Sequence, residues 1–79
     1  MSEFIATIKP AYRDAWNFLQ RHVDRYESAP DDDSYWKIVC NELVDLSSKH
    51  NNHPAAMALF AAAFEQLEIF YKERKRDTA

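Results

Sequence analysis

Cys40, His22, His50 and His53 carry the side chains that a metal ion or a thiol-dependent reaction would use. Structural zinc sites usually take paired Cys and His ligands that are a few residues apart. His50 and His53 have such a spacing, but no second close pair exists, and His22 can complete a set only if folding brings it near. A metal- or thiol-dependent site built from Cys40, His50 and His53 is therefore the alternative hypothesis. The main prediction includes no metal and no cofactor.

The acidic run at residues 31–33 does not have the pattern of a calcium loop. Such a loop needs carboxylates at alternate positions and a glycine at its sharp turn, whereas these aspartates are contiguous and the chain contains no glycine. We expect Asp33 to cap the helix that follows. No motif brings a nucleophile, a base and oxyanion donors together, which catalysis requires. We predict a protein that is not an enzyme, with no catalytic residue and no small-molecule substrate.

The elements that carry these residues are predicted to be helices, because a glycine-free chain with few β-branched residues favours an all-α fold. Apolar stripes with helical spacing indicate helices at about residues 10–27, 33–49 and 54–76. Pro10 and Pro54 suit first turns. Residues 1–9 form either an arm or a short extra helix, and residues 77–79 form a frayed end. Short loops favour antiparallel neighbours, so we predict one domain over residues 1–79, a small antiparallel three-helix bundle.

The predicted core combines the large apolar residues of these three stripes. The first stripe runs through Tyr12, Trp16, Leu19, Val23 and Tyr26, and the second through Tyr35, Trp36, Val39, Leu43 and Leu46. The residues expected to meet in the core are Trp16, Leu19, Val23, Trp36, Val39, Leu43, Phe60, Phe64 and Leu67. Phe18, Ile38 and Val44 lie outside these stripes or at their margins, so we expect them to add to the apolar surface.

The uncharged stretch at residues 54–64, PAAMALFAAAF, is too short for a membrane span, which needs about 20 apolar residues. Its large residues share one arc of the helix and its alanines lie on the other. Alanine there either fills surface positions as the best helix former, or lets another helix approach closely. The candidate interaction surface is Ala55, Ala58, Ala62, Ile69 and Ile38. We predict a homodimer in which two copies of the helix-three part of this surface, Ala55, Ala58, Ala62 and Ile69, meet.

The composition limits the partners and the compartment. The net charge is −3 and no segment is basic enough for a nucleic-acid footprint, so nucleic acid is not an expected partner. A single cysteine fits a reducing compartment. The first ten residues, MSEFIATIKP, have an acidic residue where a signal peptide has basic ones. We expect a cytoplasmic protein that does not interact with membranes.

Residues 31–39, DDDSYWKIV, and residues 52–72, NHPAAMALFAAAFEQLEIFYK, resemble short uncharacterised helical accessory proteins of bacterial mobile elements and phages. The resemblance rests on the acidic residues before Tyr35 and Trp36, the Asn-His-Pro at residues 52–54 and the alanine-rich helix. It implies a bacterial interaction protein that modulates a larger host or element protein, and it names no catalytic residue. The predicted function is therefore a non-catalytic protein–protein interaction module with an unknown partner.

Overall fold

The chain folds into three α-helices, and the part that the structure describes contains no strand. The computed structural model describes residues 2–24 and 33–78, and the side chains of the last helix as far as Arg74. In chain order the helices are α1 (Glu3–Asp24), α2 (Asp33–Lys49) and α3 (Pro54–Thr78). The predicted all-α bundle is confirmed. Tyr26, the rest of the predicted helix after Asp24, and the first two aspartates of the acidic run lie outside the described residues.

Helix α1 begins at Glu3 and continues through Pro10, so residues 3–9 are neither an arm nor a separate helix. Ser2 caps the helix, since its Oγ accepts a hydrogen bond from the backbone N–H of Phe4 at 3.1 Å. A proline inside a helix removes the bond to the carbonyl four residues earlier. Pro10 and Ala6 are both exposed, so the carbonyl of Ala6 can bind water instead. This exposure explains why the helix is not interrupted.

Helix α2 ends in a Schellman motif made by two asparagines. The N–H of Asn52 donates to the carbonyl of Ser47 at 2.8 Å, and the N–H of Asn51 donates to that of Ser48 at 3.0 Å. Asn51 and Asn52 have φ angles of 59° and 53°, a left-handed conformation that asparagine tolerates better than most residues. Asparagine here replaces the glycine that the chain lacks, and the tight turn makes α3 antiparallel to α2.

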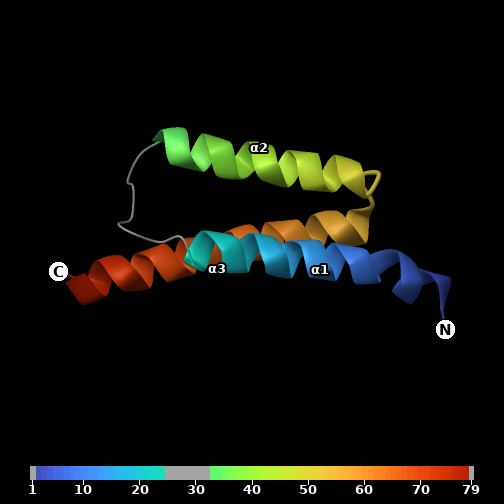
Figure 1. Ribbon diagram of the computed structural model, residues 1–79, viewed down its shortest axis with the longest axis horizontal. Helices are drawn as coiled ribbons and strands as arrows, with labels where there is room; N and C mark the ends of the chain where they lie inside the picture. The colour runs from blue at the N-terminus through green and yellow to red at the C-terminus, as the bar shows by residue number, and fades with distance from the viewer. Residues whose placement is uncertain (1, 25–32, 79) are drawn as a thin grey trace.

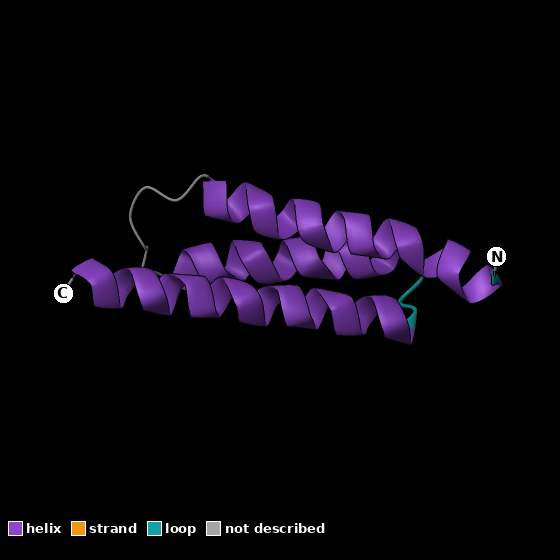
Figure 2. Cartoon of the chain, turned by 90° about the horizontal axis from the view of Figure 1, so that it is seen from below, coloured by secondary structure: helices purple, strands orange, loops and turns teal. Residues whose placement is uncertain are grey.

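Helices α1 and α3 lie side by side and run in the same direction, while α2 runs the opposite way (Figure 1). Of the helix pairs, α1 and α3 are in the closest contact. Figure 2 shows α2 behind this pair, so the viewer looks onto the side of α1 and α3 that α2 does not cover. The N-terminal end of α1 and the C-terminal end of α3 project at opposite ends (Figure 1), which gives an elongated molecule of 48 × 23 × 17 Å.

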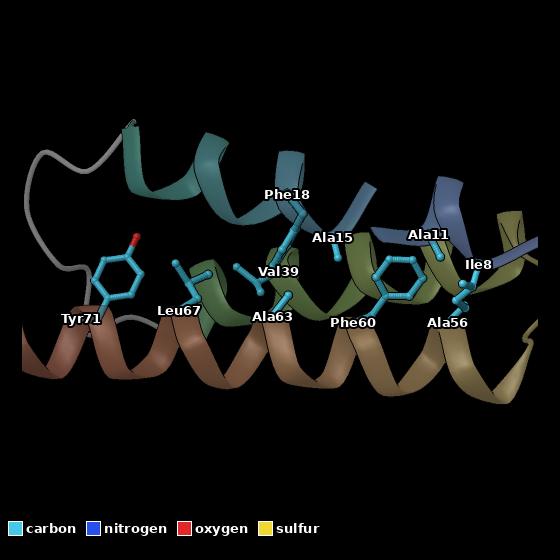
Figure 3. Close-up of a cluster of buried hydrophobic side chains, with 10 residues drawn as sticks. All are labelled: Ile8, Ala11, Ala15, Phe18, Val39, Ala56, Phe60, Ala63, Leu67 and Tyr71. Atoms are coloured by element: carbon cyan, nitrogen blue, oxygen red, sulfur yellow. The ribbon is translucent and has the colours of Figure 1, made fainter. Parts of the chain in front are cut away.

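The core differs from the prediction in its α1 residues. Tyr12 and Trp16 are 59% and 63% exposed, so their assignment to the buried stripe was wrong, whereas Phe18, expected at the surface, is fully buried. The buried side chains, drawn in Figure 3, are Ile8, Ala11, Ala15, Phe18, Val39, Ala56, Phe60, Ala63, Leu67 and Tyr71. The other predicted core residues, Leu19, Val23, Trp36, Leu43 and Phe64, are half-buried and pack against this cluster.

Small residues explain why α1 turns Ala11 and Ala15, and not Tyr12 and Trp16, toward α3. Ala11 and Ala15 of α1 are buried, as are Ala56 and Ala63 of α3, and Figure 3 shows all four in the space between the two helices. Alanine lets helix backbones approach toward the short end of the usual range of 8–10 Å. A tryptophan at the same place would hold the helices apart. The close approach inside the chain therefore uses alanines other than those predicted to receive a second helix.

Candidate functional site

The side of α1 and α3 that α2 does not cover carries exposed apolar residues. We call it the α1–α3 face and define it by Phe4, Ile5, Tyr12 and Trp16 of α1 with Ala55, Ala58 and Ala62 of α3. Two adjoining grooves follow it, with volumes of about 310 and 200 Å³. Phe4 and Ile5 are 53% and 49% exposed, comparable to the two larger aromatic residues farther along. This apolar face continues over several helical turns, unlike the single exposed apolar residues that are common on protein surfaces.

The two helices contribute different halves of this face. Tyr12 lines the first groove together with Ala55 and Ala58, and it also lines the second, where Trp16 faces Ala62. Since Tyr12 and Trp16 are four residues apart, they lie above one another on one edge of α1. The α1 edge is therefore bulky and aromatic, and the α3 edge is flat.

The structure places three of the five predicted surface residues on this face. Ala55, Ala58 and Ala62 line its grooves. Ile69 is 44% exposed farther along α3, and Ile38 is 61% exposed on α2; neither lines these grooves. The sequence reasoning missed the aromatic half because it had assigned Tyr12 and Trp16 to the core. A signal was available: residues 8, 11, 15 and 18 also have helical spacing, and burying their face exposes the other stripe.

A third groove lies between α2 and α3. It has a volume of about 440 Å³ and is lined by Cys40, Leu43, Val44, Ser47, Asn52, Met57, Phe60, Ala61 and Phe64. Val44 and Met57 are 62% and 47% exposed at this groove. The groove is mostly apolar, and Cys40, an exposed free thiol, is one of its polar groups. Its chemistry suits an apolar ligand or side chain.

A chain of hydrogen bonds joins all three helices at one end of the core. His22 of α1 lies between Glu42 and Tyr35 of α2, with Nε2 2.9 Å from the Glu42 carboxylate and Nδ1 3.0 Å from the Tyr35 hydroxyl. The hydroxyl of Tyr71 on α3 donates to the Tyr35 hydroxyl at 2.7 Å. Arg21 pairs with the same carboxylate. Each group has a partner when His22 donates from Nε2 and accepts from Tyr35 at Nδ1.

This chain of groups has the order of a catalytic relay of carboxylate, imidazole and hydroxyl, but the Tyr35 hydroxyl also accepts a hydrogen bond from Tyr71 in a half-buried position. Burial, the hydrogen bond with Tyr71 and the nearby Glu42 raise the pKa of Tyr35 above its ordinary value, so the phenol stays protonated. The arrangement instead satisfies polar groups in a half-buried position, where an unpaired group would be costly, and it fixes α2 against the α1–α3 pair.

The two histidines of the alternative metal hypothesis, His50 and His53, have other partners. His50 Nε2 lies 2.7 Å from the Asp14 carboxylate, which also pairs with Lys49 at 3.1 Å. His53 caps α3, because its Nδ1 accepts a hydrogen bond from the backbone N–H of Ala55 at 3.1 Å. Within residues 2–24 and 33–78 no group of three Cys, His, Asp or Glu side chains is placed to hold a metal ion. Burial alone would raise the pKa of Asp14, but the hydrogen bonds and positive charges of His50 and Lys49 lower it overall.

Comparisons with known proteins give no family assignment. No family model, no curated protein and no solved structure matches this chain. Among the helices that the structure describes, none has both the length and the hydropathy required to cross a membrane. The function must therefore be inferred from the geometry of the surface.

Proposed function

We propose that this protein is a non-catalytic protein–protein interaction module whose binding surface is the α1–α3 face. The observation that carries the proposal is the exposure of Tyr12 and Trp16 beside the alanines of α3. Aromatic residues are enriched at the centres of protein interfaces, where they contribute much of the binding free energy. Here two of them stand 59% and 63% exposed over adjoining grooves.

The rest of the molecule supports binding rather than chemistry. The polar groups of the hydrogen-bonded chain are occupied with one another, and the pKa of Tyr35 is raised. The net charge of −3 favours a protein partner over a nucleic acid. A helical bundle that offers an apolar edge fits a partner helix laid along the groove.

Site-specific photo-cross-linking in the cells that make the protein tests this proposal. A photoreactive amino acid at Ala58 should cross-link to protein, whether a second copy or another chain. The control is the same residue at Ile38, which is also exposed and apolar but lies on α2 and lines none of the grooves described above. Adding Trp16→Lys should abolish the cross-links from Ala58. No cross-links from Ala58, or equal yields from Ala58 and Ile38, would contradict the proposal.

A further inference from the structure

We propose that the α1–α3 face binds a second copy of this chain, about a two-fold axis parallel to the helices, so that α1 of each copy lies on α3 of the other. This inference rests on the proposed function and specifies its partner. A two-fold interface presents the same surface twice. The face must therefore be complementary to itself, and two independent features, its shape and its charge, satisfy that condition in the same orientation.

The first feature is shape. The α1 edge carries the large side chains of Tyr12 and Trp16, and the α3 edge carries Ala58 and Ala62. With the axis parallel to the helices, the aromatic edge of each copy lies over the alanine edge of the other. With the axis in the interface but across the helices, α1 would meet α1 and α3 would meet α3. Two aromatic edges would then hold the alanine edges apart and leave a gap, which close-packed interfaces avoid.

The second feature is charge. At about 100° per residue, Lys9 and Arg13 follow Trp16 around α1 on the side away from α3, and Glu65 follows Ala58 around α3 on the side away from α1. All three charged residues are exposed. Arg13 of one copy therefore meets Glu65 of the other when the axis is parallel to the helices; Lys72, exposed on the same rim of α3, is about two helical turns beyond Glu65 and outside this pair. In the crossed arrangement, basic would meet basic, and this repulsion would select against it.

The positions of Arg13 and Glu65 along the helix axis also allow them to meet. Tyr12 lines grooves with both Ala58 and Ala62, so the adjacent Arg13 lies near the level of this part of α3. Glu65 is three residues beyond Ala62, a rise of about 4.5 Å. A symmetry operation along the helix axis preserves these levels. The long side chain of Arg13 can then reach Glu65 of the other copy, and symmetry forms this ion pair twice.

The size of the face indicates a weak, concentration-dependent dimer. From Phe4 to Leu19 the groove-lining part of α1 extends about 22 Å, and two helices side by side are about 20 Å wide. The two copies therefore cover roughly 900 Å² of projected area, below the roughly 1,200–2,000 Å² that stable complexes bury. Such a dimer is expected to form at micromolar or higher concentration, and both monomer and dimer are then measurable.

Charge reversal tests the partner and the orientation together. Sedimentation equilibrium over a wide concentration range would be measured for the wild type, Arg13→Glu, Glu65→Arg and the double variant. Each single change replaces two attractive pairs by two repulsive ones, so the dissociation constant should rise by about tenfold or more. The double variant should restore the wild-type value. Lys37→Glu, an exposed charge change on α2, is the matched control and should change nothing.

Each outcome decides the inference. A wild type that stays monomeric at every concentration overturns it, and the cross-linking from Ala58 then shows separately whether another protein uses the face. A dimer that all three charge variants leave unchanged places the interface elsewhere and also overturns it. Single variants that weaken the dimer without rescue in the double variant overturn the parallel orientation. Circular dichroism checks that the variants fold, as substitutions at exposed positions should allow.

Discussion

Replacing Phe18 by alanine should remove a large part of the stability of this fold, whereas the same change at Trp16 should leave the fold nearly intact. Phe18 is fully buried and Trp16 is 63% exposed. A buried phenylalanine cut back to alanine costs about 3–5 kcal/mol, which combines the lost transfer free energy with the cavity left behind. Only about a third of the Trp16 surface is covered, so its truncation should cost under about 1 kcal/mol.

These magnitudes are large compared with the stability of the whole chain. At about 0.05–0.15 kcal/mol per residue, a domain of 79 residues has roughly 4–12 kcal/mol in total. Phe18→Ala should therefore shift the urea midpoint strongly downward or leave the protein partly unfolded in buffer. Because the proposed dimer would add stability at high concentration, the Trp16→Ala variant must be compared with the wild type at a concentration where both are monomeric.

Urea denaturation followed by far-UV circular dichroism measures both variants. Phe18→Leu, which keeps most of the buried volume, is the control and should cost much less than Phe18→Ala. A loss below about 1 kcal/mol for Phe18→Ala would refute the assignment of the core face of α1. A loss of about 3 kcal/mol or more for Trp16→Ala would show that the other stripe is buried.

Three further predictions concern polar groups. Asp14→Asn should lower the free energy of unfolding by about 1–3 kcal/mol at neutral pH. The folded state lowers the pKa of Asp14 from 3.8, so the difference in stability between wild type and variant should vanish as the pH falls below that value. Urea midpoints measured over this pH range would show it. Because the folded state raises the pKa of Tyr35, the free energy of unfolding should fall as the pH rises past 10.0. In the same assay, Tyr35→Phe should reduce this dependence of stability on pH. The same dependence in wild type and variant would contradict the raised pKa. Asn51→Ala should lower the free energy of unfolding by about 1 kcal/mol and Asn51→Gly should not, because residue 51 has a positive φ; equal thermal melts would refute this.

Local signals predicted the helices well. The boundaries of α2 match the prediction at both ends, and α3 begins at the predicted Pro54, because caps, prolines and turn residues act through neighbouring backbone. The same local logic failed at Pro10. A proline was expected to start the helix, but it lies inside one on the exposed side of α1. Whether a free carbonyl can bind water depends on which side faces solvent, and tertiary packing determines that.

By itself, the sequence determined an all-α chain, the stripes of α2 and α3 that supply Val39, Phe60 and Leu67 to the core, and a flat alanine edge on α3. Only the tertiary structure decided which of two apolar stripes of α1 is buried, because both have helical spacing. Close packing with α3 favours the face with Ala11 and Ala15, since the smaller side chains let the helices approach. That choice leaves Tyr12 and Trp16 exposed beside Ala58 and Ala62, and so the two halves of the proposed binding face come together only in the folded chain.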